Sequence, residues 1–113
     1  MNAETTIPLE EHSELAGVAF IQDYVEFHFD GSILRAIADP TIKMEGQIVN
    51  RSDQGWRDAL CSLIGKEILS IIITENKDCE IRFTTGELVK IDLSARSESL
   101  HFVPGPNQPL EVW

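Results

Sequence analysis

Residues 25–36 read VEFHFDGSILRA, which places an Asp-Gly dipeptide between two runs of alternating apolar residues. This combination is the strongest short-range signal for a β-hairpin, because both loop positions of a tight hairpin turn tolerate positive φ. A two-residue loop at this dipeptide pairs Phe27 with Leu34 on one face of the hairpin and Glu26 with Arg35 on the other. A register shift of one residue would put Phe27 on the polar face, so this pairing is strongly specified.

A second hairpin is predicted further along the chain. The triplet Thr84-Thr85-Gly86 fits a three-residue loop with its glycine in the left-handed position. This loop pairs Ile81 with Val89 on one face and Glu80 with Lys90 on the other. The second hairpin is therefore also predicted to have one apolar and one polar face.

The two hairpins match position by position, with Phe29 corresponding to Phe83. Each follows a Leu-x-Gly triplet and precedes a further strand that ends at a glycine. We interpret the match as a degenerate internal duplication of a helix-plus-meander unit, at residues 8–46 and 55–105. Chance similarity between two amphipathic hairpins is the alternative.

Two short helices are predicted, one before each hairpin. In residues 55–64, Trp56 and Leu60 share one face at helical spacing, and a glycine follows as a stop signal. In residues 8–15, a proline in the first turn and early acidic residues are typical of a helix start.

The remaining segments are predicted to be strands. Residues 66–74 are apolar on both faces, which is typical of a central strand covered on both sides. Residues 110–113 are predicted to return as a short edge strand after a proline-rich run. Together these elements predict an α+β fold of antiparallel β-meander units, with one or two short helices packed on the sheet. A chain of 113 residues is expected to form one domain, because two halves would each be too short for a good core.

The composition is that of an ordinary globular protein, with 42% hydrophobic and 25% charged residues. No stretch approaches the roughly 20 apolar residues of a membrane span. The N-terminus lacks the basic start and apolar core of a secretory signal, and two cysteines are too few for a disulfide framework. We therefore expect a reduced, cytoplasmic protein.

The charge is strongly negative and unevenly distributed. Nineteen acidic against nine basic residues give −10, and residues 1–34 hold seven acids but no lysine or arginine. Such a surface repels phosphate backbones and anionic membranes, so neither nucleic acid nor a membrane is expected as a partner. The charge either serves solubility or forms a negative face that steers toward a basic protein partner. The candidate contact residues of such a face are Glu10, Glu11, Glu14, Glu26 and Asp30.

The sequence lacks the common catalytic motifs, including a phosphate-binding glycine loop, a Gly-x-Ser-x-Gly elbow and a His-Glu-x-x-His pair. Glu26, His28 and Asp30 alternate along one strand, but they extend over about 13 Å at about 3.3 Å per residue, too far to converge on one metal ion. We therefore expect no catalytic residues, no cofactor and no metal site.

Self-association is a further expectation. Sheet edges that no other element covers are liable to pair with another chain. Trp113 ends the proline-rich tail, where it either folds back to cap the core or marks an interface. We expect a homodimer or higher oligomer that uses a sheet edge or this tail.

Three short motifs carry a resemblance to known proteins: Leu-x-Gly at residues 15–17 and 63–65, Phe-Asp-Gly at 29–31, and Glu-Val-Trp at 111–113. With these motifs, residues 15–39 and 63–113 resemble small bacterial domains of unknown function, whose relatives include immunity proteins of polymorphic toxin systems. The resemblance implies a compact α+β domain without enzyme chemistry, and it assigns no catalytic or binding residues.

Two classes of function follow from these features. The first is a non-enzymatic protein-binding domain, such as a bacterial immunity or inhibitor protein, whose acidic surface occupies a basic groove of its partner. The alternative is a domain that binds a small molecule between sheet and helix, or a self-assembling structural domain.

Overall fold

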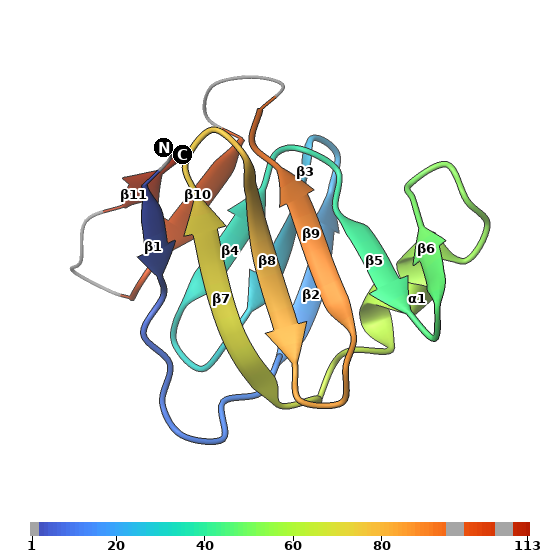
Figure 1. Ribbon diagram of the computed structural model, residues 1–113, viewed down its shortest axis with the longest axis horizontal. Coiled ribbons are helices and arrows are strands. Elements are labelled where there is room, and N and C mark those ends of the chain that lie inside the picture. Colours follow the sequence, from blue (N-terminus) through green and yellow to red (C-terminus); the bar gives the residue numbers. More distant parts are fainter. Residues whose placement is uncertain (1–2, 95–98, 106–109) are drawn as a thin grey trace.

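The computed structural model describes residues 3–94, 99–105 and 110–113, which form two antiparallel sheets stacked face to face (Figure 1). In spatial order, the strands of the six-stranded sheet are β1 (Glu4–Thr6), β7 (Ile68–Thr74), β8 (Asp78–Phe83), β9 (Leu88–Asp92), β5 (Thr41–Met44) and β6 (Gln47–Val49). The strands of the five-stranded sheet are β11 (Glu111–Val112), β10 (Leu100–Val103), β4 (Ile33–Ala36), β3 (Tyr24–His28) and β2 (Gly17–Ile21). The one helix in the described part of the chain is α1 (Trp56–Cys61).

The predicted first hairpin is confirmed as β3 and β4. Phe27 faces Leu34 and Glu26 faces Arg35, in the register derived from the sequence. Both apolar residues are fully buried. The turn residue Gly31 has a φ of 83°, as a tight hairpin turn with positive φ requires.

The predicted second hairpin is confirmed as β8 and β9. Ile81 faces Val89 and Glu80 faces Lys90. Gly86 has a φ of 101°, and its N–H donates to the carbonyl of Phe83 at 3.0 Å. Alternation along both hairpins sends every second side chain into the space between the sheets, where the core is located.

The two halves of the chain exchange strands. After the β2-β3-β4 meander, β5 crosses to pair with β9 in the other sheet. After the β7-β8-β9 meander, β10 crosses to pair with β4. The orders β2-β3-β4-β10-β11 and β7-β8-β9-β5-β6 therefore correspond strand by strand, and neither half completes its sheet without the other. An origin of this correspondence in internal duplication stays a prediction.

The helix predicted for residues 8–15 is wrong, because this segment is irregular and His12 has a φ of 62°. In a helix, the backbone groups of this segment would form hydrogen bonds with one another; here the backbone of Leu15 forms hydrogen bonds with residues 65 and 66 instead. The N–H of Leu15 donates to the carbonyl of Lys66 at 3.1 Å, and the N–H of Gly65 donates to the carbonyl of Leu15 at 2.7 Å. Leu15 itself is fully buried, so tertiary burial and pairing override the local helix signals.

The helix predicted for residues 55–64 is confirmed in its central part as α1, with Trp56 and Leu60 buried. Its position differs from the expectation, because α1 lies at the side of the sandwich near β2 and β5 rather than flat on a sheet (Figure 1). The fold is therefore β-rich, with two antiparallel sheets and little helix, and the α+β label applies only weakly.

The strand predicted at residues 66–74 is confirmed as β7 (Ile68–Thr74), but the expectation that it is central and covered on both faces is wrong, because its buried residues lie on one face. It lies second from the edge, because β1 pairs along its outer side. An irregularity between Ile68 and Ser70 turns Leu69 outward, where it is 64% exposed. The predicted edge strand near the C-terminus is confirmed as β11, which pairs with β10. None of the described residues form a helix that is long and apolar enough to cross a membrane.

Candidate functional site

Two of the predicted acidic contact residues meet at one pocket. Glu10, from the loop between β1 and β2, and Asp30, from the turn between β3 and β4, line a cavity of about 280 Å³. We call this cavity the acidic pocket. Its lining residues are Pro8, Leu9, Glu10, Ser13, Phe29, Asp30, Ser32, Phe102 and Pro104.

Local hydrogen bonds hold both acidic residues at the pocket. The carbonyl of Glu10 accepts the backbone N–H of Ser13 at 3.2 Å and its hydroxyl at 2.6 Å, which closes a turn around Glu10. The hairpin turn that carries Asp30 is closed by the N–H of Phe29, which donates to the carbonyl of Ser32 at 2.9 Å. The pocket is therefore lined by residues whose backbones are restrained.

The charge at the acidic pocket is not neutralised within the described part of the chain. Neither the Glu10 nor the Asp30 carboxylate makes an ion pair there, and no lysine or arginine lines the cavity. The largely buried rings of Phe29 and Phe102 supply an apolar wall beside the carboxylates. Apolar surface beside free carboxylates suits a cationic side chain with a long aliphatic stem.

Glu11 and Glu14, the other two predicted acids of this loop, do not line the pocket. Glu11 lies 3.6 Å from the Nε2 atom of the exposed His12 ring. Glu14 forms an isolated β-bridge with Glu67, whose carboxylate lies 3.4 Å from Nδ1 of His12. Both acids are exposed on the same loop as Glu10.

Glu26 lies apart from the acidic pocket, on the outer face of β3. Its carboxylate accepts a hydrogen bond from Nε of Arg35 at 3.0 Å, and Nε2 of His28 lies 3.0 Å from its other oxygen. Burial alone would raise the pKa of Glu26, but these hydrogen bonds and charges together hold that pKa below its ordinary value. Glu26 is thus an internally paired anion, whereas Glu10 and Asp30 have no such partner in residues 3–94, 99–105 and 110–113.

Trp113 packs against the core from the end of β11. Its backbone N–H donates to the carbonyl of Leu100 at 2.8 Å, and the backbone N–H of Leu100 donates to the carbonyl of Trp113 at 3.0 Å. Of the two roles considered for this residue, capping of the core is therefore the one that the structure shows.

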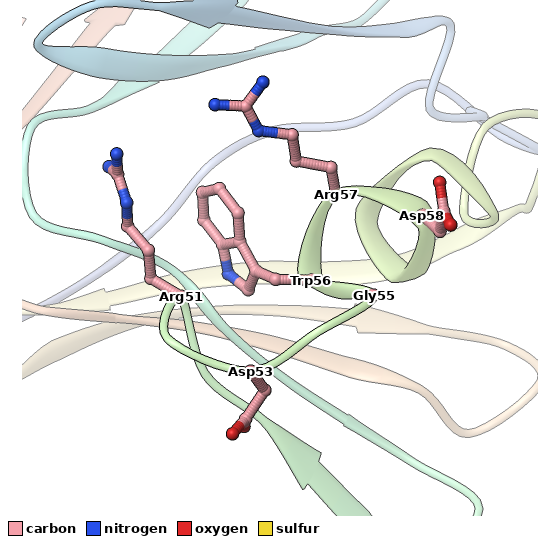
Figure 2. A pocket seen from close by; sticks show the side chains of 6 residues that line it. All are labelled: Arg51, Asp53, Gly55, Trp56, Arg57 and Asp58. Carbon is pink, nitrogen blue, oxygen red and sulfur yellow. The ribbon is translucent and has the colours of Figure 1, made fainter.

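A second candidate site was not foreseen from the sequence. The guanidinium carbon of Arg51 lies 5.5 Å from the centre of the Trp56 ring, and that of Arg57 lies 5.3 Å from the centre of the Phe20 ring. Figure 2 shows Arg51 and Arg57 on either side of the Trp56 indole. Aromatic residues near arginines are common in any sequence, so only the tertiary fold, which brings β2 to the start of α1, identifies this group.

The two arginines line a cavity of about 180 Å³, which we call the arginine pocket. Its lining residues are Phe20, Ile21, Gln22, Val25, Arg51, Trp56 and Arg57. Of these residues, Arg51, Trp56 and Arg57 also line the adjoining cavity of about 280 Å³ in Figure 2, together with Asp53 and Asp58. The carboxylate of Asp53 points away from both guanidinium groups.

The acidic pocket and the arginine pocket lie at opposite ends of β3. Val25 near the start of this strand lines the arginine pocket, and Phe29 just beyond its end lines the acidic pocket. Four residues of extended chain separate them by about 13 Å.

Comparison of the chain with models of protein families, with curated proteins and with solved structures found no match.

Proposed function

We propose that this chain is a cytoplasmic, non-enzymatic protein-binding domain of the immunity or inhibitor type, which binds a basic segment of a protein partner at the acidic pocket. The observation that carries the proposal is the convergence of Glu10 and Asp30, from two different loops, on one cavity with apolar walls. Neither carboxylate makes an ion pair among the described residues, so both are available to a cation from a partner.

The chemistry of the acidic pocket favours an arginine or lysine side chain as the inserted group. The aliphatic stem of such a side chain packs against the rings of Phe29 and Phe102, while its charged end reaches Glu10 or Asp30. Hydrogen bonds to charged groups contribute about 1.5–3 kcal/mol each. Arginine is also enriched among the residues that dominate the energy of protein interfaces.

The charge of the whole chain supports the same choice of partner. A net charge of −10 raises the rate of encounter with a basic surface and rejects acidic ones. Glu11 and Glu14 lie on the same loop as Glu10 without lining the pocket, so they contribute to long-range steering rather than to direct contact.

The experiment uses a library of random peptides displayed on phage, selected against the intact protein. We expect the selected sequences to share an arginine or lysine flanked by apolar residues. Synthetic versions are then titrated by calorimetry against the wild-type protein, E10Q/D30N and E11Q/E14Q. The two double variants change the net charge equally, and asparagine keeps the turn because Asn-Gly is as favourable in a tight hairpin as Asp-Gly.

We expect E10Q/D30N to weaken peptide binding by about tenfold or more, equivalent to about 1.4 kcal/mol. E11Q/E14Q should weaken it only slightly at about 0.15 M salt, where charges further than about 8 Å apart are largely screened. Equal weakening by both variants would show that net charge alone acts and that the acidic pocket is not the contact site. Selection of peptides without any basic residue would contradict the proposal outright.

A further inference from the structure

In the arginine pocket, two cationic side chains line a cavity that has no carboxylate in its lining. This is unexpected in a protein with nineteen acidic and nine basic residues. Most described basic residues are paired, as Arg82 is with Glu80 at 3.0 Å and Lys66 with Glu87 at 3.0 Å. The lack of a carboxylate in its lining distinguishes this cavity from the adjoining one, which Asp53 and Asp58 also line.

The aromatic rings beneath the two arginines are held in fixed positions. Nε1–H of Trp56 donates to the carbonyl of Pro40 at 2.8 Å, and the Trp56 and Phe20 rings meet edge to face at 5.7 Å between centres. A guanidinium that lies over a fixed ring has fewer conformations to lose when it binds an anion. The pocket is thus partly organised before any ligand enters.

Both guanidinium groups retain donors for a ligand. Arg57 makes no ion pair among the described residues, and its guanidinium lies over the Phe20 ring. Arg51 pairs with Asp39 at 3.0 Å through one terminal nitrogen, but a guanidinium carries five N–H donors in a planar fork. Two such forks can each bind a pair of oxygen atoms.

Part of the remaining lining is apolar, and this part bears on which kind of anion fits. Ile21 and Val25 line the cavity together with the two aromatic rings, and the Gln22 amide supplies a neutral polar group. A fully hydrated inorganic ion would leave these apolar walls unused. A cavity of about 180 Å³ has room for about six water molecules at about 30 Å³ each, which is the size of a small organic acid.

We propose that the arginine pocket binds a small organic carboxylate, whose two oxygens contact Arg51 and Arg57 and whose hydrocarbon part lies against Phe20 and Ile21. Binding here is separate from binding at the acidic pocket, because the two pockets share no lining residue. The protein therefore carries an anion site and a cation site at the two ends of one strand.

The test uses butyrate as the probe and follows the indole N–H signals of the ¹⁵N-labelled protein by NMR. Trp56 reports on the arginine pocket, and Trp113, which lies outside it, serves as an internal reference. Butyramide has the same shape without the charge, phosphate has the charge without the hydrocarbon part, and chloride at equal ionic strength controls for screening.

We expect a saturable shift of the Trp56 signal with butyrate, at least tenfold weaker binding of phosphate, and no saturable shift with butyramide or chloride. R57Q should weaken butyrate binding at least tenfold, whereas R82Q, which removes an exposed arginine from the outer face of the other sheet, should leave it unchanged within twofold. E10Q/D30N should also leave it unchanged, which separates this inference from the function proposed for the acidic pocket.

Three results would overturn the inference. Equal shifts with butyrate and chloride would mean that only ionic screening is observed. Equal affinities for butyrate and phosphate would show that the apolar walls contribute nothing and that the ligand is not an organic acid. Unchanged butyrate affinity in R57Q would show that the second guanidinium is not part of the site.

Discussion

Glu26 and Arg35 form an ion pair across the β3–β4 hairpin, with Nε and a terminal nitrogen of Arg35 each 3.0 Å from Oε2 of Glu26. The side chain of Glu26 is only 12% exposed, and the guanidinium of Arg35 also lies over the Tyr24 ring at 4.9 Å. Partial burial reduces the screening that makes most exposed ion pairs weak. The pair thus reinforces the register of the hairpin on the face opposite to the core.

We expect the stability contributed by this pair to depend on pH. Because the folded-state pKa of Glu26 lies below its ordinary value of 4.5, the contribution is complete above about pH 4.5 and is lost as the pH falls through the lowered pKa. E26Q should therefore lower the free energy of unfolding by about 1–3 kcal/mol at pH 7. In urea titrations at a series of pH values, this deficit should shrink toward pH 3.

The exposed E4Q variant is the matched control for E26Q, because Glu4 makes no ion pair among the described residues. Its effect on the free energy of unfolding should stay near zero throughout. A deficit in E26Q that is independent of pH would indicate that the glutamine disturbs packing rather than the ion pair.

The two hairpin turns depend on glycine. G86A should destabilise the protein by about 1–3 kcal/mol, because its φ of 101° is strained for any residue with a Cβ atom. G17A is the control, since a Cβ atom there would meet the Cβ of His28 at an ordinary 3.8 Å and its backbone has no positive φ. Thermal unfolding should show a clearly lower Tm for G86A than for G17A, and equal losses would mean that the turn accepts alanine.

Trp56 joins α1 to the loop before β5 through its indole N–H. W56F removes the hydrogen bond to the carbonyl of Pro40 and leaves a small void in the core. We expect a loss of about 2–4 kcal/mol in urea unfolding, since an unsatisfied buried acceptor and the lost ring volume both contribute. A loss similar to that of an exposed substitution such as R82Q would contradict the role of Trp56 as an anchor.

The C-terminal strand should contribute to the stability of the monomer. Truncation after residue 109 removes the two hydrogen bonds between Leu100 and Trp113 and the contact of the Trp113 ring with the core. We expect a clear loss of stability in thermal unfolding, on the order of 2–4 kcal/mol. Sedimentation of the intact and truncated chains then tests the predicted homo-oligomer, and self-association of the intact chain alone would place the interface at this tail.

The two free cysteines should differ in reactivity. Cys61 is exposed, whereas Cys79 is fully buried in β8, where burial and the neighbouring carboxylates of Asp78 and Glu80 raise the pKa of its thiol. A thiol reagent should label one cysteine in the native protein and both in urea. Rapid labelling of Cys79 without denaturant would show that β8 opens locally.

The two hairpins could be predicted from the sequence because the residues that specify each one are neighbours along the chain. At Asp30-Gly31 and at Gly86, a glycine with positive φ fixes the turn, and alternation on either side then determines which residues face each other. The Glu26–Arg35 pair follows directly from that register. The same reasoning identified Trp56 and Leu60 as the buried face of a helix.

Elements whose partners are distant in sequence could not be derived in this way. Residues 8–15 carry local helix signals, but the buried Leu15 bonds to Gly65 and Lys66, and these long-range contacts determine the conformation. The exchange of β5 and β10 between the sheets could not be predicted from local sequence either. A strand shows the same alternation of apolar and polar residues whether it pairs with its own hairpin or with the opposite sheet.

The candidate site was likewise predicted only in part from the sequence. The sequence alone determined that residues 1–34 are acidic and that Glu10 and Asp30 are candidate contacts, because charge is a property of composition. Only the tertiary structure decided that these two carboxylates, from two separate loops, line one pocket. The reason is that Glu10 and Asp30 lie on loops far apart in sequence, and the packing of the chain alone determines whether such loops lie side by side.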